Sequence, residues 1–186
     1  MSRVERLARN FERLVSLPWD RTLAGPQKIW MVVYDKTEER RLRAEITEFE
    51  IAARNSGHSW ITCDMTDVFA QWLAGQEYKE AYFESPEDLE LAYPEFAFHC
   101  AKLLADVLTS EAANDDTIAG LTGTGALFPF VRVSDLISAA ASKIRGRLVV
   151  FFPGEYENNN YRLLDARDGW NYHVIPITEH EEAHEK

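Results

Sequence analysis

Four acidic residues stand at or just after the ends of apolar segments that are strand candidates. They are Asp35, Asp64, Asp67 and Glu155. Because the carboxyl ends of parallel strands meet at one edge of a sheet, these carboxylates could converge and hold a divalent cation, which prefers oxygen ligands. Asp35 and Asp64 also suit the turns and caps that begin helices. We favour these structural roles and assign no metal or other cofactor.

A glycine-rich turn, Gly123-Thr124-Gly125, stands between a strand candidate and a helix candidate. Glycines in this position allow backbone N–H groups to approach the phosphates of a nucleotide. A phosphate-binding loop would continue with Gly-Lys-Ser or Gly-Lys-Thr, and a dinucleotide fingerprint would need a glycine at 128. The chain has Leu-Phe-Pro-Phe at 127–130 instead. A structural tight turn is favoured, and nucleotide binding through Gly123 and Gly125 is the alternative.

Nucleophilic catalysis requires a serine or cysteine beside a histidine. The chain has five histidines: His58, His99, His173, His180 and His184. None of them adjoins a nucleophile in a recognisable motif. The pattern therefore predicts that the protein is not an enzyme.

A polar and aromatic cluster follows the last strongly apolar segment. Its tyrosines, arginines, acids and amides are residue types found where proteins bind one another, although Asn-rich loops are also common in plain turns. The sequence alone leaves two interpretations of this cluster open: a surface that recognises another protein, or a rigid loop bonded to itself. The candidate protein-binding residues are Gly154, Glu155, Tyr156, Asn159, Asn160, Tyr161, Arg162, Arg167, Asp168, Trp170 and Tyr172.

The elements that position these residues follow from apolar periodicity. Strands are predicted over 28–34, 59–65, 117–122 and 148–152, the last ending at Pro153-Gly154. Helices are predicted over 2–16, 37–55 (capped by Thr37), about 66–73 and 134–145, with a mostly helical region over 76–114 that Pro94 divides. A hairpin is expected over 161–177, across Arg167-Asp168-Gly169.

Strands that alternate with helices predict parallel crossovers, and hence an α/β fold. We expect one three-layer domain over 1–178, with a mostly parallel sheet of about five strands and helices on both faces. The fold should be Rossmann-like or a degenerate relative of the P-loop fold. Residues 179–186 form an acidic tail with no core pattern.

Charge and cysteine content restrict the function classes. The formal net charge is −11, which disfavours direct nucleic-acid binding because phosphates require a basic surface. Cys63 and Cys100 lie far apart in apolar contexts, which is typical of buried thiols in a reduced compartment. No apolar run reaches transmembrane length and the amino terminus does not resemble a signal peptide. We expect a cytoplasmic protein without membrane contact.

Several long segments resemble the BrxB family, the small component of bacterial BREX anti-phage systems. The resemblance is carried by FFPGEY (151–156), NNYRLL (159–164), ARDGWNY (166–172), WMVVYD (30–35), EAYFES (80–85) and GALFPFVRVS (125–134). It spans about 5–178 and implies a role in phage defence. BREX systems mark host DNA by methylation and block replication of phage DNA. The family has no established catalytic residues to transfer to this chain.

Together, the residues and the resemblance predict a non-enzymatic adaptor of a BREX complex. The resemblance implies association with PglZ, a BREX component of the alkaline phosphatase superfamily, and we expect docking through residues 154–172. The alternative is a nucleotide- or metal-dependent enzyme or sensor that uses Gly123–Gly125 with Asp35, Asp64 and Glu155.

Overall fold

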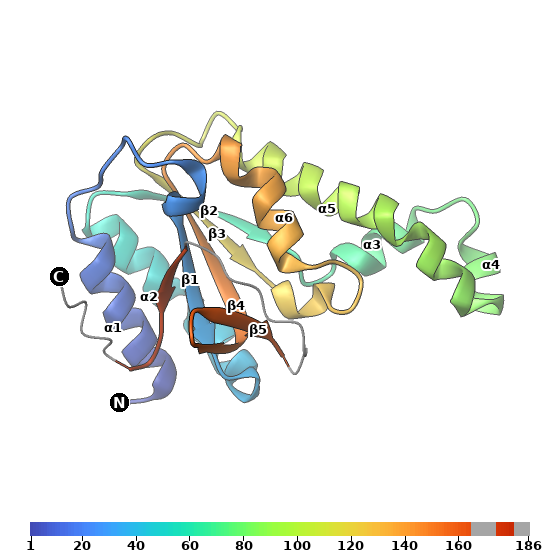
Figure 1. Ribbon diagram of the computed structural model, residues 1–186, viewed down its shortest axis with the longest axis horizontal. Helices are drawn as coiled ribbons and strands as arrows, with labels where there is room; N and C mark the ends of the chain where they lie inside the picture. Colours follow the sequence, from blue (N-terminus) through green and yellow to red (C-terminus); the bar gives the residue numbers. More distant parts are fainter. Residues whose placement is uncertain (165–173, 181–186) are drawn as a thin grey trace.

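The computed structural model describes residues 1–164 and 174–180 and has the predicted α/β architecture, with helices on both faces of a mostly parallel sheet (Figure 1). The strands are β1 (Ile29–Tyr34), β2 (Ser59–Asp64), β3 (Thr117–Thr122), β4 (Arg147–Glu157), β5 (Asn160–Leu163) and β6 (Ile175–Ile177). The α-helices are α1 (Arg3–Val15), α2 (Glu39–Asn55), α3 (Val68–Ala74), α4 (Lys79–Glu84), α5 (Tyr93–Leu108) and α6 (Val133–Ala140). Short 3₁₀ segments are η1 (Gly25–Lys28), η2 (Lys36–Glu38), η3 (Pro86–Ala92), η4 (Thr124–Leu127) and η5 (Ala141–Lys143).

The sheet has six strands rather than about five, and its main path runs β2-β3-β4-β1-β6. All pairs along this path are parallel, whereas β5 pairs antiparallel with the far end of β4. The order differs from the 3-2-1-4-5-6 order of the dinucleotide-binding fold. It places β1, the first strand of the chain, between β4 and β6, so the carboxyl ends of these three strands meet at one edge of the sheet.

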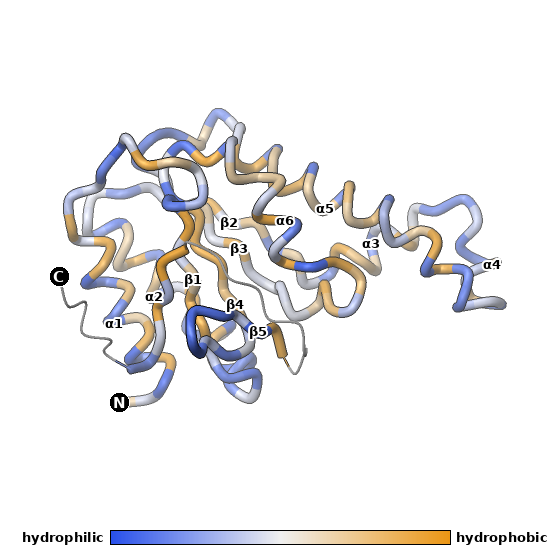
Figure 2. Tube along the Cα trace, viewed as in Figure 1, coloured by the Kyte–Doolittle hydropathy of each residue, from blue (hydrophilic) through white to orange (hydrophobic). Residues whose placement is uncertain are grey.

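Both faces of the central strands are buried, which explains why their sequences are apolar without alternation. In β1, Trp30, Val32 and Tyr34 pack against α1 and α2, while Ile29 and Met31 pack against the opposite layer. Figure 2 shows this as an apolar interior along the strands, with polar segments outside. The opposite layer consists of α3, α5 and α6.

Side-chain caps mark the start of α1 and of η2. Ser2 and Glu5 form a capping box at the start of α1, which confirms the predicted amino-terminal helix. Thr37 was expected to cap the next helix, but it lies inside η2, and Asp35 is the cap that accepts a bond from its backbone N–H. Asp is the better acceptor at this position because its carboxylate can take both the Thr37 N–H and its hydroxyl.

One of two predicted boundaries is wrong. The helix over 134–145 ends at Ala140 and continues only as η5; beyond it, Lys28 Nζ binds the Ile144 and Arg145 carbonyls, just before β4. Pro94 divides the helical region over 76–114 as predicted: it occupies the first turn of α5, directly after η3, where its missing N–H has no helical partner to lose.

Strand β4 does not stop at Pro153-Gly154, as the sequence suggested, but continues to Glu157. Pro153 pairs in register with Tyr34, the last residue of β1, and its carbonyl accepts the Leu164 N–H at 2.8 Å. Beyond this point β4 leaves the parallel sheet and pairs with β5. The proline therefore stands where the parallel ladder ends, a position that strands tolerate.

The segment from α4 through η3 to the first turns of α5 projects from the rest of the molecule, at the right of Figure 1. In the part of the chain that the structure describes, no helix is both long and apolar enough to cross a membrane.

Candidate functional site

The candidate site is a β-hairpin at the carboxyl end of the central strand β4. Its loop is Asn158-Asn159, and both residues have positive φ angles, 51° and 63°. Two consecutive residues with positive φ form the tight turn whose twist matches a hairpin, and asparagine tolerates this conformation better than most residues. The amides predicted to belong to a recognition surface thus have a backbone role at the tip of the hairpin.

Side chains alternate across the hairpin. Glu155 and Arg162 are paired in register, point outward and are exposed, with Arg162 Nη1 3.5 Å from a Glu155 carboxylate oxygen. Tyr156 is half-buried, and its hydroxyl donates to Asn159 Oδ1 at 2.9 Å. Asn160 lies exposed beside the tip. Glu155, Asn160 and Arg162 thus face solvent on one side of the hairpin, whereas Tyr156 lies on the inner side, with its ring 4.7 Å from that of Tyr161, its partner in register.

Tyr161 was expected on this surface, but it is 0% exposed. Its ring packs edge-on against Phe152, with centroids 6.0 Å apart, and its hydroxyl donates to the Val174 carbonyl at 3.2 Å. The reason is the strand period of two, which directs Tyr161 inward between the outward-facing Asn160 and Arg162. The side chain of Tyr161 therefore fixes the hairpin to the core and is not available to a partner.

Gly154 has a structural role as well. A Cβ at this position would lie 2.0 Å from the Arg162 carbonyl oxygen, so only glycine permits the close pairing of β4 with β5. The remaining candidates, Arg167, Asp168, Trp170 and Tyr172, and the hairpin predicted across 167–169, lie outside the described residues.

A cavity of about 270 Å³ lies beside the hairpin, where the carboxyl ends of β1, β4 and β6 meet α1. It brings together two of the predicted strand-end acids, Asp35 and Glu155, with Arg3 and Glu179. Arg3 lies 3.7 Å from the Asp35 carboxylate and 3.6 Å from that of Glu179, which also accepts from Arg6 at 2.8 Å. Glu179 was assigned to the tail; its ion pairs join it to α1, a contact between distant segments that no sequence signal predicts.

The other strand-end acids do not join this group. The Oδ1 atom of Asp64 accepts the Thr66 N–H at 3.0 Å and its hydroxyl at 2.6 Å, the arrangement that Asp35 makes with Thr37. These bonds lower the pKa of Asp35. For Asp64, burial acts to raise the pKa, but the Thr66 bonds together with a Thr122 bond and the charge of Arg43 outweigh it, so its pKa is lowered too. Asp67 precedes α3 without a side-chain capping bond. Across 1–164 and 174–180, no three His, Cys, Asp or Glu side chains are grouped so as to hold a metal ion.

The glycine turn is filled by protein. Gly123 has φ 72°, and a Cβ there would lie 2.4 Å from the Thr66 backbone nitrogen. Thr124 is buried and donates its hydroxyl to the Phe151 carbonyl at 2.6 Å, while Gly125 faces Pro153. The segment that follows is the four-residue η4 rather than a long helix. These contacts give both glycines packing roles.

Neither thiol has the environment of a nucleophile. Both cysteines are free and buried, and burial raises the pKa of Cys63 to about 11 and that of Cys100 to about 12. Thiolate is the reactive form, so these values make both groups unreactive near neutral pH. His58 stacks on Trp19 with centroids 3.6 Å apart, and desolvation lowers its pKa.

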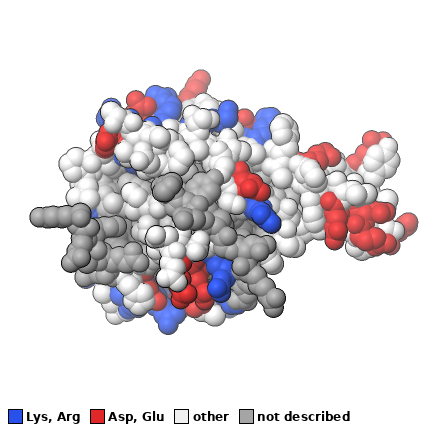
Figure 3. All heavy atoms as spheres, viewed as in Figure 1, with Lys and Arg blue, Asp and Glu red and all other residues white. Residues whose placement is uncertain are grey.

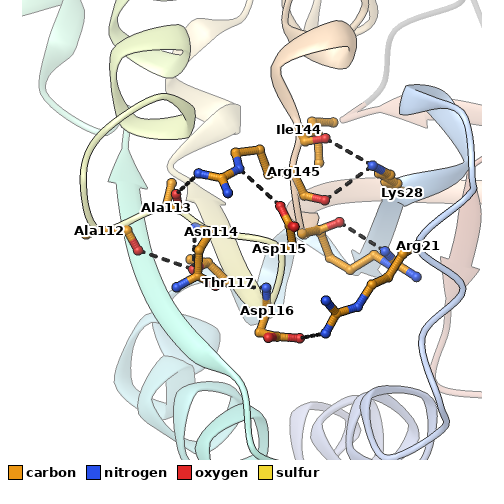
Figure 4. Close-up of polar contacts among 12 residues, drawn as sticks. Arg21, Lys28, Ala112, Ala113, Asn114, Asp115, Asp116, Thr117, Ile144 and Arg145 are labelled. Atoms are coloured by element: carbon orange, nitrogen blue, oxygen red, sulfur yellow. Dashed lines mark hydrogen bonds and ion pairs between the residues drawn. The ribbon is translucent and has the colours of Figure 1, made fainter.

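A polar network at the opposite edge of the sheet, near the amino ends of β3 and β4, was missed by sequence reasoning (Figure 4). Arg145 donates to Asp115 and to the Ala113 carbonyl, and Arg21 donates to Asp116. Arg147 is buried, lies over the Trp19 ring at 4.6 Å, and donates to the Asp20 carbonyl. The cationic groups bind backbone carbonyls and aspartates of the protein itself, so they tie loops together.

Residues 62–175 match the family model described as BREX protein BrxB. The matched segment is more than half of the chain and runs from β2 to the first residue of β6, so it includes the whole hairpin. The chain belongs to the BrxB family. Searches of curated proteins and of solved structures found no match.

Membership of the BrxB family makes the protein a component of a BREX defence system. It confirms the resemblance stated from the sequence, and it suggests other BREX components as partners. Within the matched segment lie the hairpin, the glycine turn and the projecting helical segment, whereas α1, β1 and Glu179 of the cavity lie outside it.

Proposed function

We propose that this BrxB-family protein is a non-enzymatic adaptor of a BREX complex and docks PglZ through the exposed face of its β4–β5 hairpin. The supporting observation is the hairpin itself, which projects from the carboxyl end of a central strand and presents Glu155, Asn160 and Arg162 on one side. Arginine and tyrosine are enriched among the residues that dominate binding energy at protein interfaces.

The hairpin is suited to docking because it is held in shape before a partner arrives. Its inner face is fixed by Tyr161, and its tip by the Tyr156–Asn159 bond. A preformed surface loses less conformational entropy on binding than a loop that must order itself, and this favours affinity. The adaptor role also agrees with buried thiols of raised pKa and with a glycine turn that packs on protein.

The test is the affinity for purified PglZ of a double variant, Glu155→Ala with Arg162→Ala. Both side chains are exposed, so we expect the variant to fold, and we expect Kd to rise at least tenfold, about 1.4 kcal/mol of lost binding energy. A matched control, Glu50→Ala with Arg54→Ala, removes an ion pair of α2 on another surface. An unchanged Kd for the hairpin variant, with normal thermal stability, would reject this docking surface.

The hairpin variant should also weaken defence. Cells that carry the complete BREX system with the hairpin variant should lose phage resistance, measured as plating efficiency, whereas the α2 control should retain it. Full resistance with a hairpin variant that no longer binds PglZ would separate the contact from defence and reject the adaptor role.

The competing proposal is a nucleotide- or metal-dependent enzyme or sensor of the same system. It is supported by the cavity at the carboxyl ends of β1 and β4, which Asp35 and Glu155 line, although the packed Gly123–Gly125 turn and the acidic lining oppose phosphate binding. Calorimetric titration with ATP, GTP and Mg²⁺ distinguishes the two. Saturable heat that Asp35→Asn abolishes would favour this second function.

The proposal places the protein in the cytoplasm, in keeping with its two free, buried cysteines, and requires neither membrane nor nucleic-acid contact. A net charge of −11 repels phosphates, so no gel shift with duplex DNA is expected even at low salt.

A further inference from the structure

We infer that residues 77–98, called the acidic arm below, form a second docking surface, for a protein partner that presents an apolar groove bordered by lysine or arginine. The arm comprises α4, η3 and the first turns of α5. It is separate from the hairpin proposed above to bind PglZ, and it projects from the helical layer that contains α3 and α5 (Figure 1).

The arm is held to the core by few side chains. Helix α4 has no buried residue, and η3 buries only Ala92. The first turns of α5 bury Phe96, whose ring packs against Phe69, Trp72 and Phe130 and anchors the base of the arm. Tyr82 and Leu89 are partly buried against the core and orient the arm. The hydrogen bonds between Tyr78 and Asp88 in the described structure are local turn bonds, such as Ser85 N–H to the Ala81 carbonyl at 2.9 Å. Most of the surface of the arm is therefore available to another molecule.

Four large apolar side chains of the arm face solvent. Tyr78 is 68% exposed, Phe83 62%, Leu91 84% and Phe98 71%. The remaining exposed large apolar residues of the described chain are spread over four other segments: Met1, Leu17, Ile51 and Phe128. Single exposed apolar residues are ordinary, but four within one projecting segment are typical of an interaction site.

The same segment concentrates the negative charge. The arm has seven acidic residues and one lysine, a net charge of −6 out of −11 for the whole chain. The acidic residues, all exposed, are Glu77, Glu80, Glu84, Glu87, Asp88, Glu90 and Glu95. Figure 3 shows acidic side chains gathered at the projecting end of the molecule.

These carboxylates have no cationic partner within the described part of the protein. Across 1–164 and 174–180, no salt bridge includes an acid of the arm, and the Lys79 ammonium donates to the Ala74 carbonyl. Helix α2 shows the opposite arrangement, because its Arg41–Glu45 and Arg54–Glu50 pairs neutralise charge along its face. Cations on a partner would supply what the arm lacks, and complementary potentials both speed association and select the partner.

Charge also decides between possible occupants. Nucleic acid and anionic membranes would be repelled by a segment of net charge −6. A second copy of the chain would have to offer a basic groove, but the groove between α1 and α2 has four acids in its lining, Glu5, Glu12, Glu45 and Glu48, against Arg9. A different protein with a basic border around an apolar groove is the partner that fits both the charge and the exposed aromatic residues.

The experiment measures Kd between this protein and each of the other proteins of its BREX system, purified separately. The apolar variant is Phe83→Ser with Leu91→Ser, and its control is Leu17→Ser with Ile51→Ser, at exposed apolar residues elsewhere. The charge variant is Glu80→Gln with Glu84→Gln, and its control is Glu12→Gln with Glu48→Gln, at exposed acids of α1 and α2.

For one of these proteins we expect the apolar variant to raise Kd at least tenfold and the charge variant to reduce the dependence of Kd on salt, with both controls near wild type. The inference is overturned if no protein of the system binds through the arm, meaning that every Kd is the same for the arm variants and wild type. It is also overturned if sedimentation shows wild-type self-association that the arm variants abolish, because the occupant would then be a second copy.

The two surfaces fail separately. Loss of PglZ binding in the hairpin variant, with unchanged binding of every component by the arm variants, supports the proposed function and rejects the acidic arm. Binding that the arm variants weaken and the hairpin variant leaves unchanged supports the acidic arm and rejects the hairpin as the docking surface. The hairpin and the arm share no residue, so a variant of one surface leaves the other intact.

Discussion

At the scale of single residues, two of the four acids considered as metal ligands, Asp35 and Asp64, are bound by the threonine two positions later. Asp20, Asp35 and Asp64 each accept both the backbone N–H and the hydroxyl of Thr22, Thr37 and Thr66, respectively. Three Asp-X-Thr segments thus form the same local turn, whereas Asp115-Asp116-Thr117 has the pattern without the turn: the Thr117 hydroxyl donates to the Ala112 carbonyl and the Asp115 carboxylate accepts from Arg145. The pattern was visible in the sequence, but only the bond geometry distinguishes a turn from a ligand set.

We predict that Thr37→Val raises the pKa of Asp35, because the hydroxyl bond is the largest of the effects that lower it. A lowered carboxyl pKa in the folded state contributes stability above the ordinary value of 3.8, and that stability is lost as pH falls through the folded value. The variant should therefore be less stable than wild type at pH 7, and the difference should disappear in acid, below both values. NMR titration measures the pKa of Asp35 in each protein. Urea unfolding at pH 7 and in acid measures the difference in stability.

Thr37→Ser is the matched control because it retains the donor hydroxyl. The control should leave the pKa of Asp35 near its wild-type value. If Thr37→Val also leaves the pKa of Asp35 unchanged, the hydroxyl bond is not what lowers this pKa. The predicted loss of stability at pH 7 is then rejected as well.

At the scale of elements, the hairpin depends on residues whose importance lies in the backbone. A Pro-Gly pair normally indicates a turn, but β4 continues through Pro153-Gly154. Only the pairing of β4 with β5 shows why glycine is required at 154. The period of two could have placed Tyr161 inside once the turn at 158–159 was known. The sequence predicted a different turn, at 167–169, and so left the inward and outward faces unassigned.

We predict that Asn158→Val destabilises the protein by about 1–2 kcal/mol, because a β-branched residue is strained at positive φ. Asn158→Gly is the comparison: glycine adopts φ 51° without strain, so the free energy of unfolding should stay within ~0.5 kcal/mol of wild type. Urea unfolding of the three proteins measures both effects. Equal stability of the valine and glycine variants would contradict a strained turn at this position.

At the scale of the whole molecule, the fold was predictable because strands buried on both faces have unmistakable apolar runs, as in β1 and β4. Their order was not, since no local signal indicates that β1 lies between β4 and β6. The helical character of the acidic arm was predictable, because the arm lies within the region over 76–114 that was expected to be mostly helical. Its projection from the rest of the molecule depends on which of its side chains are buried in the core. Apolar periodicity does not predict which of them are buried.

The uncompensated charge of the arm predicts a dependence of its local stability on salt. Repulsion among exposed carboxylates is screened as the Debye length falls from ~30 Å at 0.01 M to ~3 Å at 1 M salt. Amide hydrogen exchange in α4 and η3 should therefore slow as salt increases, because their local opening becomes less favourable. In α2 the Arg–Glu pairs lose attraction under the same conditions, so its exchange should stay the same or accelerate.

The Glu80→Gln with Glu84→Gln variant tests the cause. Removing two of the arm's negative charges should slow exchange in α4 at low salt and flatten its response to added salt, while α2 behaves as in wild type. If α4 and α2 respond alike to salt in both proteins, the repulsion is too weak to matter. Electrostatics would then no longer favour a basic partner for the arm. Only its exposed apolar side chains would support docking.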